Sequence, residues 1–229
     1  MNENSYEAVL VGRERELARL QQAFKGSVEG TGKLVMLLGE PGIGKTYLGE
    51  VISRHANSNG ALVLWGRCGE RGAPAYWPCI QVLREAISSS QGSALAAGSN
   101  LWLERVARTF PELRQQGEPA GLKDASSPLL FQSAPEISET PETARFNLFE
   151  SVSGFLKHTS NRRPLLILID DLQAADVDSL QLLNFMVRDF MRSRILLVMT
   201  CQNAWSDLPS DRAAMIASLT RAGERIELQ

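Results

Sequence analysis

The stretch "GEPGIGKT" at residues 39–46 constrains this chain more than any other part of its sequence. It matches the pattern G-x-x-x-x-G-K-[ST] at every fixed position; an apolar run at 34–38 precedes it, and apolar residues at helical spacing follow. A strand, a glycine-rich turn and a helix in this order form a loop whose backbone N–H groups converge on a phosphate. The alternative, a tight strand-to-helix turn with a solvated lysine, explains one or two glycines but not the whole string. The sequence therefore predicts a site for a phosphate-bearing ligand.

The side chains of this loop have distinct expected roles. Lys45 is expected to reach the β- and γ-phosphates of a nucleotide and to assist catalysis, and the Thr46 hydroxyl is expected to bind Mg²⁺. Tyr47 is expected to offer its backbone N–H to the phosphates, which makes its ring incidental. The residues expected to contact the nucleotide here are Gly39, Glu40, Pro41, Gly42, Ile43, Gly44, Lys45, Thr46 and Tyr47.

Two consecutive acidic residues mark a second part of the expected site. The run "LLILIDD" places Asp170 and Asp171 at the carboxyl end of an apolar strand, the edge at which ligands gather in open parallel sheets. Asp170 is the candidate for holding Mg²⁺ through water, and Asp171 is the candidate for orienting the attacking water. The alternative for Asp171 is the start of a turn or a cap. Asp176 is expected to be the N-cap of the next helix.

The remaining pattern predicts an α/β domain. Buried strands are expected at 34–38, 61–66, 164–171 and 194–200, with "RIELQ" beginning a fifth. Helices are expected at 11–24, 44–55, 76–87, 101–110, 140–158, 176–190 and 210–222. Residues 114–139, rich in Pro, Ser, Gly and Glu, predict a mobile insertion. The alternation predicts one domain over 1–229, with a core from about residue 8: a three-layer α/β/α sandwich with a mostly parallel five-stranded sheet.

Composition narrows the class of partner and the compartment. Lys and Arg number 24 against 26 Asp and Glu, so no global basic field attracts nucleic acid or an anionic membrane. The three cysteines, Cys68, Cys79 and Cys201, are odd in number and form no CxxC motif, which disfavours a disulfide framework and a zinc site. We therefore expect buried thiols in a reducing compartment. No apolar stretch approaches the roughly 20 residues that span a bilayer, and the N-terminus lacks a signal-peptide pattern. A cytoplasmic protein without a membrane partner is expected.

Several further motifs join the phosphate loop and the acidic strand end: "VGRERE" at 11–16, "GRCGERGAPAYWP" at 66–78, "ARFNLFESVSGFL" at 144–156 and "DDLQAAD" at 170–176. Together they resemble the ATPase domain of bacterial STAND-type signalling proteins, over about residues 8–229. This AAA-like module is found in large ATP-binding LuxR-type transcription regulators and beside some nucleotide cyclase and protein kinase domains. The resemblance implies a P-loop NTPase fold of the AAA type, with Val11, Gly12 and Arg13 beside the adenine. The alternative for Arg13 is a charged residue near a helix start.

The resemblance also implies that the fourth strand lies between the first and the third, so that its end overlooks the γ-phosphate. Family members usually carry an arginine there, in a pattern like T-x-R, and this chain has Gln202. An amide can hydrogen-bond phosphate or orient water, but it carries no charge. Because an arginine that stabilises phosphoryl transfer is worth about 10³-fold or more, we expect slow hydrolysis. Arg67 and Arg145, the latter across a subunit boundary, are candidates to compensate; the alternative is that each is a surface or ion-paired residue.

The expected function is therefore a regulatory domain that binds ATP or ADP with Mg²⁺ and hydrolyses ATP slowly. The alternative is a nucleotide-stabilised interaction scaffold with little or no hydrolysis. The resemblance implies a lid, sensor repeats and an effector domain beyond residue 229, and it allows self-association. No basic recognition helix is present, so direct nucleic-acid binding is not expected. Tyr76, Trp77 and Pro78 form either a partner-binding patch or, as we prefer, part of a packed helix.

Overall fold

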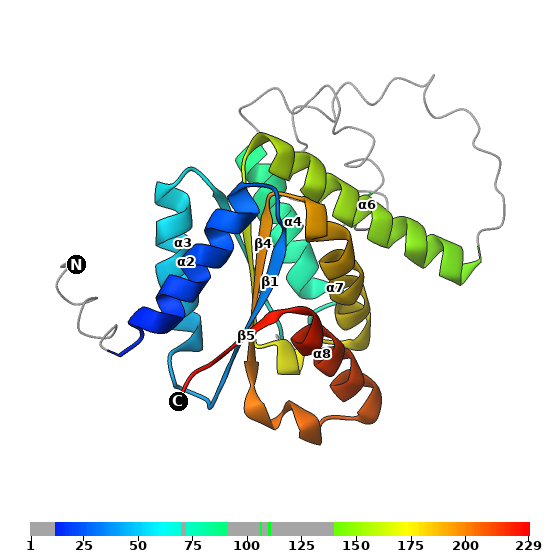
Figure 1. Ribbon diagram of the computed structural model, residues 1–229. Helices are drawn as coiled ribbons and strands as arrows, with labels where there is room; N and C mark the ends of the chain where they lie inside the picture. The colour runs from blue at the N-terminus through cyan, green and yellow to red at the C-terminus, as the bar shows by residue number, and fades with distance from the viewer. Residues whose placement is uncertain (1–11, 70–71, 91–105, 107–109, 111–139) are drawn as a thin grey trace.

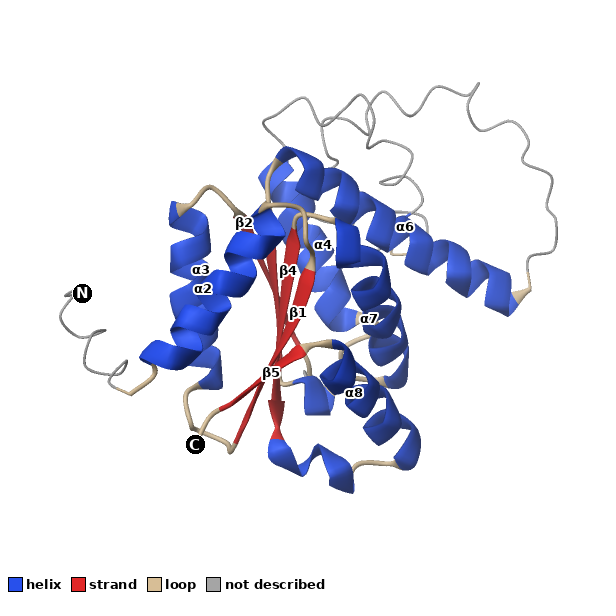
Figure 2. Ribbon diagram, viewed as in Figure 1, coloured by secondary structure: helices blue, strands red, loops and turns tan. Residues whose placement is uncertain are grey.

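A five-stranded parallel sheet organises the molecule. The computed structural model describes residues 12–69, 72–90, 106, 110 and 140–229. Its strands are β1 (Lys33–Gly39), β2 (Leu62–Arg67), β3 (Leu165–Asp170), β4 (Ile195–Gln202) and β5 (Glu224–Glu227). They lie in the order β2-β3-β4-β1-β5, and every neighbouring pair is parallel. Figure 2 shows the sheet nearly edge-on, between its helices. The predicted parallel α/β sheet is confirmed, and β4 lies between β1 and β3 as the resemblance implied.

Helices cover both faces of this sheet. They are α2 (Glu14–Val28), α3 (Lys45–Ser58), α4 (Trp77–Ser90), α6 (Pro141–Arg162), α7 (Val177–Asp189) and α8 (Ser210–Ala222). Within the described residues, short 3₁₀ turns occur at η4 (Leu172–Ala174), η5 (Phe190–Arg192) and η6 (Asn203–Asp207). Helices α2 and α3 pack on one face, and α4, α6, α7 and α8 pack on the other (Figure 1). The result is a three-layer α/β/α sandwich.

The three central strands, β1, β3 and β4, read as nearly unbroken apolar runs because both of their faces are buried. In β1, Val35 and Leu37 belong to the core beneath α2 and α3, whereas Leu34 and Met36 belong to the core on the opposite face. This follows from the period of two along a strand, and it is typical of a parallel sheet covered by helices. The apolar pattern therefore predicted the strands without indicating which face each side chain would take.

The described helices begin and end at identifiable residues. Asp176 accepts a hydrogen bond from the Ser179 N–H, so the predicted N-cap of α7 is confirmed. Thr140 caps α6 in the same way, by accepting from the Thr143 N–H. Helix α2 runs to Val28 and not to Phe24 as predicted. It ends beside Gly30, whose φ of +93° is a backbone conformation that favours glycine.

Other expectations have mixed outcomes. The helix expected at 101–110 lies outside the described residues apart from Val106 and Phe110, which are buried, and the insertion expected at 114–139 lies wholly outside them. Tyr76 packs edge-to-face against Phe110 and Phe149, in agreement with the packing interpretation of this segment. All three cysteines are free and buried, as expected. Within the described ranges, no helix has the length and apolar character needed to cross a membrane.

Candidate functional site

The loop at 39–46 joins the end of β1 to the start of α3, as its motif predicted. Gly42 has φ +77° and Gly44 has φ +101°, a region that L side chains rarely adopt, so these two glycines permit the curl of the loop. The first hydrogen bond of α3 runs from the Leu48 N–H to the Gly44 carbonyl, 2.9 Å away. The N–H groups of the first helical turn therefore have no helical acceptor, and the positive end of α3 faces the loop. An anion fits this arrangement.

Lys45 folds back over its own loop. Its Nζ donates to the carbonyl oxygens of Gly39 and Glu40, at 2.9 and 2.8 Å, and the residue is only 7% exposed. A buried ammonium needs partners, and here all those seen are neutral carbonyls. The side chain thus lies at the loop with a charge that an anionic ligand would balance.

Thr46 and Asp170 meet although 124 positions separate them in the sequence. The Thr46 hydroxyl lies 3.1 Å from both carboxylate oxygens of Asp170, and Asp170 is 1% exposed. The pairing brings a hydroxyl from the first turn of α3 to a carboxylate at the end of β3. These are oxygen donors of the type that Mg²⁺ prefers, and this cation is usually held by one or two protein groups together with phosphates and water.

Asp170 receives two further hydrogen bonds from the neighbouring strands. Thr200, in β4, donates to Oδ1 at 2.6 Å, and Arg67, at the end of β2, donates from Nη2 to Oδ2 at 3.1 Å. Asp170 is therefore fully bonded at the carboxyl edge of the sheet, so a cation held through a water molecule disturbs fewer of these bonds than direct coordination. No cluster of three or more His, Cys, Asp or Glu residues able to hold a metal ion occurs in the described part of the chain. The donor set fits a cation shared with a nucleotide.

Arg67 forms an ion pair with Asp170, in agreement with the interpretation of Arg67 as an ion-paired residue. Its side chain is 58% exposed, whereas that of Asp170 is 2% exposed. Arg67 and Asp170 also border a hollow of about 470 Å³, together with Thr46 and with Trp65 from β2. Arg67 thus lies beside the proposed metal-binding pair, on the solvent side.

Asp171 has an unusual backbone conformation. Its φ and ψ are +60° and +48°, in the left-handed region that aspartate tolerates better than most residues. Its N–H donates to the Thr200 hydroxyl at 2.9 Å, and its Oδ1 accepts from Nε2 of Gln173 at 3.0 Å. Non-glycine residues in this region cluster at functional sites. Asp171 does begin a short turn, η4, so the structural interpretation of this residue holds together with the position expected of a catalytic one.

Gln202 ends β4 beside the phosphate loop. It pairs in register with Gly39, the last residue of β1, so the expected position of this residue opposite the loop is what the structure has. Its N–H donates to Oε1 of Gln173 at 3.2 Å. No arginine occupies this register position.

The segment expected beside the adenine is described from Gly12 onward, and Val11 lies outside the described residues. Arg13 forms an ion pair with Glu16 at 3.2 Å and donates to the carbonyl oxygen of Gln229 at 2.9 Å. The neighbouring Leu228 N–H donates to the carbonyl oxygen of Leu38 at 2.8 Å, directly before the loop. The structure thus places Arg13 near the loop end of β1.

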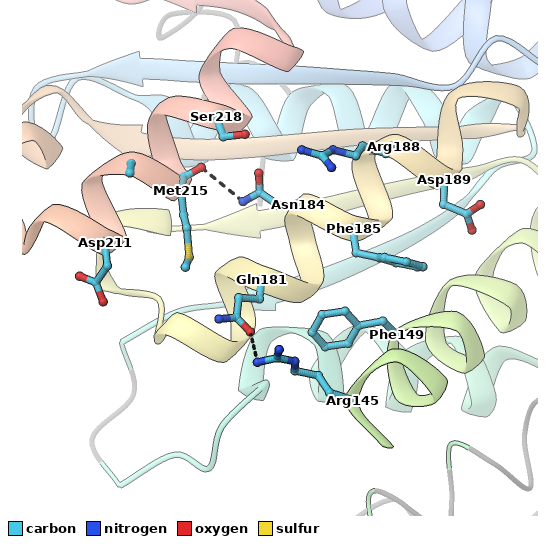
Figure 3. A pocket seen from close by; sticks show the side chains of 11 residues that line it. Arg145, Phe149, Gln181, Asn184, Phe185, Arg188, Asp189, Asp211, Met215 and Ser218 are labelled. Carbon is cyan, nitrogen blue, oxygen red and sulfur yellow. Dashed lines mark hydrogen bonds between the residues drawn. The ribbon is translucent and has the colours of Figure 1, made fainter. Parts of the chain in front are cut away.

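Arg145 lies elsewhere. It lines a groove of about 890 Å³ between α6, α7 and α8, where its Nη1 donates to Oε1 of Gln181 at 3.1 Å (Figure 3). Phe149, Phe185 and Met215 form the apolar part of this groove. Among the described residues, no hydrogen bond or ion pair joins Arg145 to the phosphate loop. A role of Arg145 across a subunit boundary stays a prediction.

Three site residues were missed by the sequence reasoning: Thr200, Gln173 and Arg212. Thr200 had a weak signal, because it is a polar residue within an apolar strand, and it is 2% exposed. Gln173 belongs to the quoted "DDLQAAD", but it was given no role of its own. Arg212 donates from Nη2 to the Gln173 carbonyl at 2.6 Å, across 39 positions of sequence, and nothing local indicated that contact.

Comparison with known proteins identifies the domain type. The family model described as "AAA ATPase domain" matches residues 9–198. A protein of Rhizobium meliloti (strain 1021), described as uncharacterized, is 27% identical over 200 residues, which are 86% of this chain. The match covers 19% of that protein, so the chain spans about a fifth of the length of the curated relative.

Solved structures with a similar arrangement include three proteins of low sequence identity. The Orc1 protein of Aeropyrum pernix, in complex with DNA, has a TM-score of 0.46 and 17% identity, over 95% of this chain and 45% of the other. PCH-2 of C. elegans has a TM-score of 0.43 and 13% identity, over 94% of this chain and 42% of the other. VirB4 of Thermoanaerobacter pseudethanolicus has a TM-score of 0.40 and 11% identity, over 84% of this chain and 76% of the other. The family match, and not these similarities, is the basis for assigning the domain.

Proposed function

The chain belongs to the AAA ATPase domain family, and from this premise we propose that it is a switch domain that binds ATP or ADP with Mg²⁺ and hydrolyses ATP slowly. The observation that carries the proposal is the contact of Thr46 with Asp170, at 3.1 Å, directly beside the folded-back Lys45. The oxygen atoms of Thr46 and Asp170, which suit Mg²⁺, and the ammonium of Lys45, which suits phosphate, meet where the positive end of α3 points. This combination suits a nucleoside triphosphate better than a simple anion.

Each residue has a definite part in this proposal. Thr46 and Asp170 would hold Mg²⁺, and Lys45 would exchange its bonds with the Gly39 and Glu40 carbonyls for bonds with phosphate oxygens. When bound, Mg²⁺ neutralises charge on the β- and γ-phosphate oxygens. Asp171 would accept a hydrogen bond from the attacking water and so orient it.

Slow turnover is proposed because Gln202 stands where a charged sensor would be expected. An arginine that stabilises phosphoryl transfer contributes about 10³-fold or more, and a neutral amide lacks its charge. Arg67 is the nearest candidate replacement, yet its guanidinium is already paired with Asp170 at 3.1 Å. The neutral Gln202 at this position also favours a second candidate function, a nucleotide-stabilised scaffold that hardly hydrolyses ATP.

The switch would belong to a larger bacterial signalling or transcription-regulatory protein of the STAND type. Support comes from the motifs that resemble this group and from a curated relative of which the chain covers only 19%. We propose a cytoplasmic location, a lid, sensor and effector domains as the attached parts, self-association as one output, and no direct nucleic-acid contact by this domain. A complete switch from 1:99 to 99:1 requires the nucleotide to prefer one state by about 5.5 kcal/mol.

Calorimetry and single-turnover hydrolysis test the proposal together. ATP and ADP affinities are measured with Mg²⁺ for the wild type, Lys45→Ala, Asp171→Asn and Gln202→Arg, with the exposed Lys25→Ala as the matched lysine control. We expect Lys45→Ala alone to lose binding, Asp171→Asn to bind but to cleave only at a slow residual rate, and Gln202→Arg to cleave about tenfold faster or more, a part of the full arginine effect.

The other outcomes separate the alternatives. Binding without cleavage in every variant would support the scaffold. No nucleotide binding by the wild type would contradict both candidate functions, and turnover as fast as that of a motor ATPase would contradict the slow switch.

A further inference from the structure

Gln173 spans the gap between Asp171 and the end of β4. Its Nε2 donates to Oδ1 of Asp171 at 3.0 Å, and its Oε1 accepts from the N–H of Gln202 at 3.2 Å. A carboxylate can only accept and a backbone N–H can only donate, so the two partners permit one orientation of the amide and exclude the flipped one. The side chain is therefore fixed at both of its polar ends.

The backbone of Gln173 is held from a third side. Arg212, in the first turn of α8, donates from Nη2 to the Gln173 carbonyl oxygen at 2.6 Å. Nε of the same guanidinium is buried and has no hydrogen-bond partner in the described portion of the chain. A guanidinium that is partly buried and bonded to a carbonyl orders the turn that it touches. Helix α8 thus braces the turn that carries Asp171 and Gln173.

These contacts bear on how Asp171 would act. A carboxylate that orients an attacking water must itself be held at a fixed angle, and a displacement of about 1 Å can cost on the order of 10²-fold in rate. Gln173 engages Oδ1 of Asp171, and among the described residues no hydrogen-bond partner occupies Oδ2, which is the oxygen that a water molecule would meet. Asp171 occupies a left-handed backbone conformation, which the surrounding bonds must maintain.

We infer that Gln173 is a positioning residue for hydrolysis: it aligns the Asp171 carboxylate and connects it to β4 at Gln202, while Arg212 braces the turn from α8. This inference rests on the proposed hydrolytic function and deepens it. It assigns to an uncharged residue the task of fixing the group that orients water, and it makes α8 part of the catalytic geometry.

Two substitutions separate the donor from the acceptor. Gln173→Glu keeps an acceptor for the Gln202 N–H but presents a negative oxygen to Asp171, whereas Gln173→Met removes both bonds at nearly the same length. We expect both to slow single-turnover ATP hydrolysis on the order of 10- to 100-fold. The affinities for ATP and ADP should change less than about twofold, because neither bond is to the phosphate loop. Gln181→Met, on α7 beside Arg145, is the matched control and should leave hydrolysis unchanged.

A double-mutant cycle tests positioning against mere stability. In the Asp171→Asn background, Gln173→Met should cause no further loss of hydrolysis, because the group that it aligns is already disabled. Arg212→Met should slow hydrolysis in the same direction, and Arg212→Lys should restore part of the rate. Thermal unfolding of each variant reports any general loss of fold.

The results discriminate between failures. Unchanged hydrolysis in both Gln173 variants, or a Gln173→Met loss that is as large without Asp171 as with it, would overturn the inference. A parallel fall in affinity and rate would also overturn it, since that pattern indicates a damaged binding site. A wild type that binds no nucleotide or cleaves none would instead contradict the proposed function on which the inference rests.

Discussion

The Thr200 hydroxyl donates a 2.6 Å hydrogen bond to Oδ1 of Asp170, and this bond joins the centre of the sheet to the proposed metal-binding carboxylate. The same hydroxyl accepts from the N–H of Asp171 at 2.9 Å. One buried side chain therefore fixes both acidic residues at the end of β3. Asp170 gains a donor, and the left-handed turn at Asp171 gains an acceptor.

Replacing Thr200 with valine should damage the site and the fold together. The substitution keeps the shape but leaves the Asp171 N–H and one lone pair of Asp170 without this partner, at a cost of about 1–3 kcal/mol. Urea unfolding measures the loss, and calorimetry should show weaker Mg²⁺–ATP binding. Thr159→Val is the control, because the one bond of that buried hydroxyl within the described part of the chain is to the Phe155 carbonyl in α6. If Thr200→Val binds nucleotide as the wild type does, the support that we assign to Thr200 is wrong.

The backbone at Asp171 makes the choice of substitution matter. Asparagine tolerates the left-handed region, whereas alanine there costs roughly 1–2 kcal/mol. We therefore expect Asp171→Ala to unfold at a lower urea concentration than Asp171→Asn, although both lose hydrolysis. Asp178→Ala and Asp178→Asn provide the comparison within the first turn of an ordinary helix, α7. Equal stability of the two Asp171 variants would argue against strain at this position.

Removing Arg67 should make the site bind Mg²⁺ more readily. Its guanidinium lies 3.1 Å from Oδ2 of Asp170 and offsets the negative charge that attracts the cation. Because a pair with one exposed partner contributes about 1 kcal/mol or less, Arg67→Gln should lower the Mg²⁺ concentration for half-maximal nucleotide binding by about fivefold at most. Arg67→Lys, which keeps the charge, should behave more like the wild type. A higher Mg²⁺ requirement in Arg67→Gln would show that the residue assists the cation or the phosphates directly.

The buried thiols should make stability fall at alkaline pH. Burial raises the pKa of Cys79 and of Cys201 from an ordinary 9.0 to about 12, because the thiolate is poorly solvated inside the protein. Between these values the unfolded chain loses a proton that the folded chain keeps, so the free energy of unfolding falls as pH rises above about 9, by up to roughly 1.4 kcal/mol per pH unit for each thiol.

Urea unfolding between pH 7 and 10 measures this slope. The variant Cys79→Ala/Cys201→Ala should show a shallower decline than the wild type, which separates the thiols from the other groups that titrate in this range. Identical slopes would contradict the pKa shifts. The native thiols should also react slowly with a thiol-specific reagent at pH 8.

Local patterns predicted much of the fold and the loop. The chain from 34 to 55 was predictable because a strand, the glycine-rich turn and α3 are continuous in sequence and each step is set by its neighbours. The placement of β4 between β1 and β3 came from the resemblance, since apolar runs alone do not tell which strands are adjacent. Helix α2 extends beyond its predicted end because Gly26 is helical and the chain turns at Gly30.

The part of the site that escaped prediction consists of contacts between distant residues. Thr200 bonds the N–H of Asp171 across 29 positions, and Arg212 reaches Gln173 across 39. Periodicity describes neighbours along a helix or strand and carries no information on such pairs. Only the placement of β4 beside β3, followed by the return of the chain through α8, brings them together.

The position of β4 between two strands that precede it in the chain has a consequence during synthesis. Residues 39–46 and 170 leave the ribosome before residues 195–202, which insert between β1 and β3 to complete the centre of the sheet. Until β4 is in place, no strand joins β1 to β3, and Asp170 lacks its hydrogen bond from Thr200. A nascent chain would therefore acquire its ligand site late and all at once, so that the ligand stabilises only chains whose sheet is already assembled.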